Sequence, residues 1–427
     1  MAIKDLKKKT LLVLFIRSIG VIFLFGFTLF ITNFFSPENV GRYEFVRTAL
    51  MMLGAAALMG TNQSIIYYSG LLKARKSSES IRQIYFKMLK IIFLLSTFIL
   101  LGFLLAFDKN LINFIFKSEE SYSLILKTVM ALIFFAITML NIDTIRALHK
   151  TILSELYRSL FRYLPVFTLA VILFIYDRQQ YLVEAYIFGF FLLSIFSSLK
   201  VAFLLRGLKK ANNKSENFSV REIFFQSAPM ALSAIAYFIM QSVDITILKI
   251  YEGFNQIAYY SVSVKLAMIT TLALMSVNIV IAPKIAEIYE QKNMKRLQNI
   301  ITLFTRVIFF ISIAVISGLY LFSEKILHLF GNEYVLANDA LVILLAAQLF
   351  NSLSGPGAIY LNMTGRQNLL NKILIVGLIT NIVLNFYFIP TEGIIGAAKA
   401  TLISLVVWNT ILVSIVYKKD RIKIFLN

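Results

Sequence analysis

The segment NVGRYEFVRTALMMLGAAALMGTN at residues 39–62 returns, without a gap, as NQIAYYSVSVKLAMITTLALMSVN at residues 255–278. The two segments share the residues Asn39, Tyr43, Val46, Leu50, Met52, Ala57, Leu58, Met59 and Asn62 with Asn255, Tyr259, Val262, Leu266, Met268, Ala273, Leu274, Met275 and Asn278. The same shift of 216 residues continues downstream, where Lys90 aligns with Arg306, Gly102 with Gly318 and Asp108 with Glu324. We infer that one unit of several helices occurs twice in this chain.

The composition indicates an integral membrane protein. Hydrophobic residues make up 59% of the 427 residues, and the mean hydropathy is +0.79, so the chain has more apolar surface than a water-soluble core would hide. The net charge is +20, but the basic residues lie in short loops between apolar runs. This pattern favours anionic lipid as a partner and argues against nucleic acid.

The sequence lacks the residues that several kinds of enzyme require. It contains no cysteine, and its two histidines, His149 and His328, have no metal-binding set around them, so we expect neither disulfides nor a metal site. It has no GxxxxGK[ST] loop either, which argues against ATP hydrolysis. We therefore predict no cofactor and no enzymatic activity.

Twelve apolar runs are long enough to cross a bilayer core of about 30 Å as helices. The first begins near residue 11 and is too long for the apolar part of a signal peptide. The runs lie near residues 11–34, 43–67, 84–107, 121–142, 155–176, 182–205, 224–248, 257–282, 300–322, 335–354, 368–389 and 394–417.

Basic residues gather in alternate loops, which orients the chain. The loops and termini that are rich in basic residues contain Lys4, Lys7, Lys8, Lys9, Lys73, Arg75, Lys76, Arg82, Arg206, Lys209, Lys210, Lys214, Lys292, Lys295, Arg296, Lys418, Lys419, Arg421 and Lys423. By the positive-inside rule these loops and both termini are cytoplasmic, as an even number of spans also requires.

The polar segment GLKKANNKSENFSVRE is the longest hydrophilic stretch and separates the two copies. We therefore predict an N-terminal six-helix lobe at residues 1–206, a cytoplasmic linker at 207–222 and a C-terminal six-helix lobe at 223–427. The predicted fold is an all-α membrane protein of twelve transmembrane helices in two six-helix bundles. Since each copy has six helices, the bundles should be related by a pseudo-two-fold axis along the membrane normal.

Five cations lie within predicted spans: Arg17, Arg47, Lys90, Lys265 and Arg306. A charge at the centre of a span costs about 2.5–3.5 kcal/mol on insertion scales, so such residues are candidates for a functional site. A cavity lined by cations would attract an anion. The alternative is that Lys90 and Arg306 extend to the lipid headgroups, and that Arg47 pairs with Glu44.

Carboxylates at similar depth are fewer, chiefly Asp143 and Asp244. Asp244 is a candidate for coupling to a cation, or else the partner of Lys265 or Lys249. Asn381 and Asn385 share one helix face and either line a sugar path or join helices. Asn62 and Asn278 are more typical of helix packing. Gly355-Pro356-Gly357 should interrupt its helix.

Three stretches resemble the polysaccharide and oligosaccharide-lipid flippases of the multidrug/oligosaccharidyl-lipid/polysaccharide exporter superfamily. These stretches are SPENVGRYEF at residues 36–45, SVDITILKIY followed by IAYYSVSVKLA in the second copy, and the block from Gly355 to Asn409. The resemblance covers nearly the whole chain. It implies two six-helix bundles around a cationic central cavity, working by alternating access.

The resemblance also suggests which residues bind substrate. In the peptidoglycan-precursor flippases of this superfamily, cavity arginines lie in helices 1, 2 and 8, and Arg17, Arg47 and Lys265 occupy similar places here. Lysine in helix 8 keeps the charge but loses the two-pronged geometry of arginine. Those relatives carry two further carboxy-terminal helices, whereas this sequence has twelve predicted spans, which favours an O-antigen or capsule flippase.

The functional hypothesis is a flippase for polyprenyl-pyrophosphate-linked oligosaccharide in a bacterial inner membrane. Substrate binding is assigned to Arg17, Arg47, Lys265, Arg306, Lys90 and Asn385, and ion coupling to Asp244. A polysaccharide polymerase and chain-length machinery are possible protein partners. The alternatives are a multidrug exporter of the same fold, whose cationic substrates would need buried carboxylates, a membrane glycosyltransferase or polymerase, and an assembly partner that transports nothing.

Overall fold

The computed structural model describes residues 3–75, 80–208 and 218–426, without the side chains of residues 3–11, 14, 74, 233, 234, 237, 273 and 279. These residues form helices and turns but no strand. The chain divides into two compact units, residues 1–238 and 239–427. Residues 209–217 of the predicted linker lie outside the described residues, and the linker's last three residues already belong to a helix.

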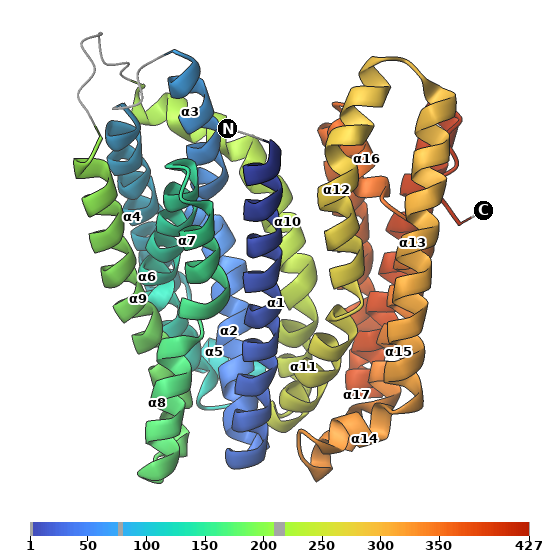
Figure 1. Ribbon diagram of the computed structural model, residues 1–427. Coiled ribbons are helices and arrows are strands. Elements are labelled where there is room, and N and C mark those ends of the chain that lie inside the picture. The colour runs from blue at the N-terminus through green and yellow to red at the C-terminus, as the bar shows by residue number, and fades with distance from the viewer. Residues whose placement is uncertain (1–2, 76–79, 209–217, 427) are drawn as a thin grey trace. The chain divides into compact units, whose positions relative to one another are not determined.

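The first unit is a bundle of long helices with short connecting turns (Figure 1). Within it, α6 is central because it packs against α2, α3, α4 and α9. The elements are α1 (Ile3–Phe34), α2 (Pro37–Leu58), α3 (Thr61–Ala74), α4 (Ile81–Ala106), α5 (Lys109–Phe116), α6 (Ser121–Ala147), α7 (Thr151–Leu156), the π-helix η2 (Tyr157–Phe161), α8 (Leu164–Ile175), η3 (Gln179–Tyr181), α9 (Leu182–Arg206) and the first part of α10 (Val220–Tyr251).

The second unit follows a similar order, except that the single helix α17 covers the region where the first copy has α7, η2, α8, η3 and α9. It contains the rest of α10, then α11 (Phe254–Met268), α12 (Thr271–Glu290), α13 (Met294–Leu321), α14 (Ser323–His328), η4 (Asn332–Ala337), α15 (Asn338–Leu353), α16 (Gly357–Met363) and α17 (Gln367–Asp420). Its core joins α12, α13, α16 and α17 to the last described residues of the chain, through apolar side chains such as Ile301, Leu361, Leu412 and Ile424.

The shift of 216 residues found in the sequence also relates the helix bounds. Shifted in this way, α1 would span 219–250, where α10 lies, and α4 would span 297–322, where α13 lies. Likewise, α6 would span 337–363, which α15 and α16 cover between them. The two copies of the sequence are therefore built from a similar series of helices, although most of α10 belongs to the first compact unit.

Each of the twelve predicted runs lies mainly on helix. Among the described residues, eight helices are long and apolar enough to cross a membrane, or nine if the bent pair α2 and α3 is one span. The long helix α17 counts once, although Gly393 (φ 54°, ψ −127°) divides it between two predicted runs. The chain is thus an all-helical, multi-pass membrane protein, while the twelve spans and the cytoplasmic termini stay predictions. The orienting residues Lys76, Lys209, Lys210 and Lys214 and the side chains of Lys4, Lys7, Lys8 and Lys9 lie outside the described part.

Two runs predicted as continuous helices are broken. The run at 43–67 bends by 43° between α2 and α3, because Met59 and Gly60 adopt left-handed backbone conformations (φ 42° and 74°). The run at 257–282 breaks between α11 and α12, at a different point of the repeat. The predicted interruption at Gly355-Pro356-Gly357 is confirmed, since α15 ends at Leu353 and α16 begins at Gly357.

Candidate functional site

An ion pair between α1 and α7 holds the first predicted site residue. The Nε atom of Arg17 donates to Oε1 of Glu155 at 3.0 Å, and the terminal nitrogen Nη2 donates to Oε2 at 3.0 Å. Glu155 is 9% exposed at its side chain and Arg17 is 40% exposed. The second terminal nitrogen of Arg17 has no hydrogen-bond partner among the described residues. Two parallel hydrogen bonds of this kind are stronger and more directional than a single contact.

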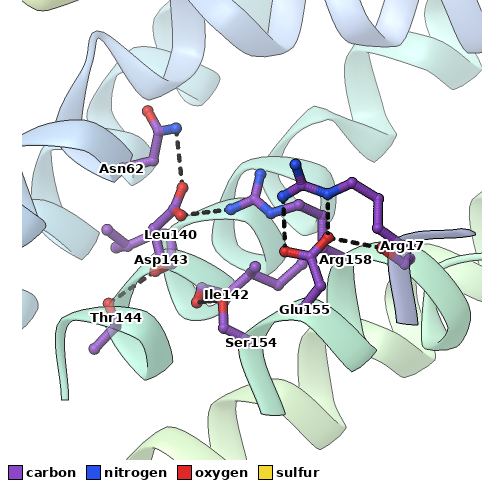
Figure 2. A network of polar contacts seen from close by, with 10 residues as sticks. Arg17, Asn62, Leu140, Ile142, Asp143, Thr144, Ser154, Glu155 and Arg158 are labelled. Carbon is purple, nitrogen blue, oxygen red and sulfur yellow. Dashed lines mark hydrogen bonds and ion pairs between the residues drawn. The ribbon is translucent and has the colours of Figure 1, made fainter. Parts of the chain in front are cut away.

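This ion pair and a second one beside it form a charge chain (Figure 2). Arg158 of η2 donates to Oδ1 of Asp143 on α6 at 2.5 Å, and Asn62 of α3 donates to Oδ2 of the same carboxylate at 3.2 Å. Glu155 also accepts from the hydroxyl of Ser159 at 2.9 Å. Two ion pairs, each of one arginine and one carboxylate, thus join α1 to α7 and η2 to α6.

Local backbone structure places these side chains. Glu155 lies on α7, and the wider turn of the π-helix η2 follows at once and carries Arg158 and Ser159. Such single π-turns are frequent at functional sites. Gly20 of α1 lies against this turn, where a Cβ atom would come within 2.5 Å of the Cβ of Ser159. The absence of a side chain at Gly20 therefore lets α1 come close enough for Arg17 to reach Glu155.

Arg47 forms a second ion pair within α2. Its Nε atom donates to Oε2 of Glu44 at 2.7 Å, and Nη1 lies 3.5 Å from the sulfur of Met51. Glu44 is fully buried. The structure therefore shows the alternative in which Arg47 pairs with Glu44. Arg17 and Arg47 share no described contact, so the first unit carries its predicted site arginines in two separate pairs.

Lys90 and Arg306, which correspond in the repeat, lie on exposed helix faces. Lys90 shares its face of α4 with the exposed rings of Phe86 and Phe93, three or four residues away. Arg306 on α13 is likewise close to the exposed Leu303 and Phe310. Such neighbours are typical of a surface in contact with lipid, which favours extension of both side chains toward headgroups.

In the second unit, Asp244 on α10 is the centre of a buried polar cluster. Its Oδ1 atom accepts from the amide of Asn385 at 2.6 Å, and Oδ2 accepts from Thr401 at 2.6 Å and from Tyr260 at 3.0 Å. The carboxylate is buried at 7% exposure, and Tyr260 and Asn385 are fully buried. All the donors to Asp244 in the described chain are therefore neutral.

The cluster continues along the face that the sequence predicted. Asn385 donates to Oδ1 of Asn381 at 3.1 Å, and Asn381 donates to Ser404 at 3.4 Å. The Oδ1 atom of Asn385 is buried and accepts no hydrogen bond in the described chain. An unsatisfied buried oxygen beside a carboxylate held by neutral groups leaves acceptor capacity for a cation. The described residues nevertheless contain no group of three or more carboxylate, histidine or cysteine side chains that could hold a metal ion.

The described hydrogen bonds to Asp244 come from Asn385, Thr401 and Tyr260, and they include neither Lys265 nor Lys249. Lys249 is buried, with its Nζ 3.4 Å from the carbonyl of Glu252 and 4.6 Å from the centre of the Phe254 ring. Lys265 is buried at 8% exposure three residues before the end of α11. A positive charge near the carbonyl end of a helix is favourable.

Some residues of these clusters were not predicted. Glu155 is the only acidic residue between Thr151 and Ile175, and this isolation in an apolar run is a signal for a buried carboxylate. The carboxylates expected within the spans were chiefly Asp143 and Asp244. Tyr260 and Thr401 have no sequence signal of their own. The two copies also differ in chemistry. At the positions that correspond in the sequence repeat, Ser233 replaces Arg17, Asn371 replaces Glu155, and Thr28 stands where the second copy has Asp244.

Comparisons with known proteins agree with the fold. The family model described as MatE matches residues 229–387. A probable low-salt glycan biosynthesis flippase, Agl15 of Haloferax volcanii, is 26% identical over 50% of this chain and 46% of its own length. The capsular polysaccharide biosynthesis protein CapF of Staphylococcus aureus is 28% identical over 45% of this chain and 48% of its own length. The matched part of this chain thus spans about half the length of these curated relatives.

Solved structures extend the likeness to nearly the whole chain. The lipid II flippase MurJ, in an inward closed conformation, has a TM-score of 0.73 at 16% identity and covers 97% of this chain and 89% of its own. The resemblance to the exporter superfamily is confirmed. A MATE multidrug transporter of that superfamily, DinF-BH, has a TM-score of 0.66 at 18% identity over 99% of this chain and 96% of its own. At these identities the structural likeness shows a shared fold. The two solved structures are named as a flippase and a transporter, which is the class of protein predicted for this chain.

Proposed function

We propose that this chain moves an oligosaccharide linked to a polyprenyl pyrophosphate from the cytoplasmic to the outer leaflet of a bacterial inner membrane. The transport would proceed by alternating access and would supply a polysaccharide of the O-antigen or capsule type. Two relatives named for glycan or capsular polysaccharide biosynthesis and a structural neighbour named as a lipid II flippase support this choice.

The observation that carries the proposal is the arrangement of Arg17. Glu155 fixes its guanidinium through two nitrogens and leaves the remaining N–H groups without a partner in the described chain. A diphosphate loses much hydration energy when it leaves water, and cations must replace that water. A guanidinium held in place, but with donors remaining, supplies such replacement at little cost in side-chain entropy.

The other predicted cations would act at different stages of transport. Arg47 is proposed to bind the diphosphate at a different stage from Arg17. Its ion pair with Glu44 has no described contact with the ion pair of Arg17 and Glu155. Lys265 would contribute positive charge in the second unit. Lys90 and Arg306 are proposed to guide headgroups at the rim, and Asn385 to respond to the charge state of Asp244, its hydrogen-bond partner.

Asp244 is the proposed site of ion coupling. A buried carboxylate whose described donors are all neutral gains most from a bound proton or metal cation, because those donors do not neutralise its charge. Binding of a cation there would change the hydrogen bonds to α17 through Asn385 and Thr401. That link connects ion binding to the position of a helix.

A multidrug exporter is the second candidate, favoured by the likeness to DinF-BH and by Asp244. The usual cationic drugs would need a carboxylate without a cationic partner. Glu44, Glu155 and Asp143 each pair with an arginine, which leaves Asp244 as the described buried carboxylate suited to that role. Because most of the described buried carboxylates are already paired with arginine, the interior favours an anionic substrate over a cationic one.

A gene deletion distinguishes these candidates. Under the proposed function, cells without this chain accumulate lipid-linked oligosaccharide that stays on the cytoplasmic face and is protected from externally added glycosidase. A polymerase would instead leave single repeat units exposed on the outer face, and a drug exporter would leave the lipid-linked pool unchanged. Either of the last two results would refute the proposal.

A further inference from the structure

A groove with a volume of ≈ 810 Å³ lies in the first unit and is lined by residues at the end of α3 and around the start of α10. Figure 1 shows these two ends of the helices near each other. Its lining includes Tyr67 and Arg75 from the α3 side and Glu222, Phe225 and Gln226 from α10. Ligand sites for small molecules occupy roughly 300–1,000 Å³. The groove has this size, and none of its residues belongs to the charge chain of Arg17 or the cluster of Asp244.

The wall of the groove is built by specific contacts. The ring of Tyr68, buried behind Tyr67, lies 5.1 Å from the ring of Phe218. The hydroxyls of Ser64 and Ser227 are 2.6 Å apart, which joins α3 to α10. The Nζ atom of Lys87 on α4 donates to the carbonyl of Phe218 at 2.5 Å. The start of α10 is thus tied to both α3 and α4.

A capping box fixes Glu222 at the entrance of α10. The backbone N–H of Ser219 donates to Oε2 of Glu222 at 2.7 Å, and the backbone N–H of Glu222 donates to the hydroxyl of Ser219 at 3.1 Å. Reciprocal bonds of this kind hold the first turn of a helix. One carboxylate oxygen of Glu222 is therefore committed to the backbone, and the other can face a ligand.

The exposed part of the groove combines aromatic rings with planar polar groups. Tyr67 is 45% exposed and Phe225 is 61% exposed. Arg75, Glu222 and Gln226 are exposed beside them. Arg75 and Glu222 are charged, and charges are costly among lipid tails, so this combination favours a surface that faces water and headgroups. The rings are therefore exposed toward water and headgroups.

This chemistry suits a sugar. The C–H face of a pyranose ring packs on an aromatic ring, and its hydroxyls accept from arginine and amide N–H groups and donate to a carboxylate. Arg75 and Glu222 carry opposite charges, so the groove has no excess positive charge that would select a phosphate. A neutral, hydroxyl-rich ligand matches both the rings and the balanced charges.

We propose that this groove binds sugar rings of the oligosaccharide. The inference rests on the proposed function, and it assigns the glycan a site separate from the cations that meet the diphosphate. The groove lies at the end of the unit that carries Lys73, Arg75 and Arg82, which the positive-inside rule places in the cytoplasm. Sugars bound there belong to substrate that has not yet crossed the membrane.

The test uses purified full-length protein and a probe without lipid or phosphate. The probe is the free oligosaccharide released by mild acid from the lipid-linked pool of the same cells, and its binding is followed by saturation-transfer NMR. Tyr67→Ala and Phe225→Ala remove the two rings. Phe98→Ala is the matched control, because Phe98 is an exposed ring on α4 outside the groove.

We expect each groove variant to bind the probe roughly 3- to 10-fold more weakly than the wild type, as loss of an aromatic contact predicts. Phe98→Ala should bind like the wild type, and Phe225→Trp should restore binding that Phe225→Ala loses. No binding by the wild type, or equal binding by all variants, would overturn the groove assignment. The assignment would also be overturned if anionic phosphatidylglycerol displaced the probe from the wild type and the substitution Arg75→Gln abolished that displacement.

Flipping by wild-type proteoliposomes separates this inference from the proposed function. If the wild type moves the lipid-linked oligosaccharide but the groove variants bind the probe normally, the groove assignment is wrong and the function stands. If the wild type binds the probe through the groove but moves no substrate, the proposed function is wrong and the sugar site stands.

Discussion

Arg17 and Glu155 are 138 residues apart in the chain, yet the guanidinium of one and the carboxylate of the other are joined by two hydrogen bonds of 3.0 Å. This contact joins α1 to α7, and the neighbouring ion pair of Arg158 and Asp143 completes the charge chain. Under the proposed function, the carboxylate that holds the guanidinium would also limit how strongly Arg17 can bind an anion.

The ion pair should show energetic coupling. Arg17→Gln and Glu155→Gln are each expected to lower the free energy of unfolding by about 1–2 kcal/mol, less than for a fully buried pair because Arg17 is partly exposed. The double variant should cost little more than either single variant, since the second change removes a group already without its partner. Thermal unfolding in detergent measures the cycle, and additive losses would contradict the pairing.

Gly20 should not tolerate a side chain. Its Cβ atom would meet Ser159 at 2.5 Å, so Gly20→Ala is expected to push α1 away from η2 and to cost about 1–3 kcal/mol through overpacking. Gly26, two turns along the same helix, has no atom within 4 Å of its would-be Cβ. Gly26→Ala is therefore the control, and it should be neutral or stabilising. Equal melting temperatures for the two variants would argue against the close approach.

The carboxylate of Asp244 should control ion dependence. Asp244→Asn keeps the size of the side chain and removes the charge, so transport by this variant is expected to lose its dependence on the ion gradient. Asp108→Asn is a suitable control, since Asp108 caps α5 through the backbone N–H of Leu111. Flux is measured with the gradient present and collapsed. Wild-type dependence in Asp244→Asn would exclude the coupling role.

Replacement of Arg366 by lysine should lower the stability of the protein. Its guanidinium binds both oxygens of Asp420 and donates to the hydroxyl of Tyr289 at 2.9 Å. Lysine keeps the charge but lacks the planar fork, so Arg366→Lys is expected to lower the free energy of unfolding by about 1 kcal/mol. Arg421→Lys, at the nearby exposed end of α17, is the comparison. A melting temperature unchanged by Arg366→Lys would show that the fork is not needed.

Much of the helix order was predictable because it depends on local patterns. Apolar runs and the repeat of 216 residues located the helices, and Gly355-Pro356-Gly357 located an interruption, since proline and glycine act on their own backbone. The break at Met59 and Gly60 was missed. A single glycine in an apolar run is usually helical, and its left-handed conformation here accompanies a close approach to the backbone of Ser227.

The candidate site was less predictable because its contacts link distant parts of the chain. The spacing of Glu155 and Arg158 suggests that they pair with each other, as residues three apart on a helix do. Instead Glu155 holds Arg17 and Arg158 holds Asp143, in a segment where the π-helix changes the helical spacing. By contrast, the shared face of Asn381 and Asn385 follows from local spacing and is confirmed by their hydrogen bond.

Reconstituted flipping tests the central claim most directly. Lipid-linked oligosaccharide is placed in proteoliposomes, and the fraction that becomes accessible to external glycosidase is followed for the wild type, Arg17→Ala and Lys265→Ala, with folding checked by melting temperature. We predict that the wild type moves substrate across the bilayer and that both variants lose at least about tenfold in rate, which corresponds to about 1.4 kcal/mol. Full activity in both folded variants, or no flipping by the wild type, would contradict the account.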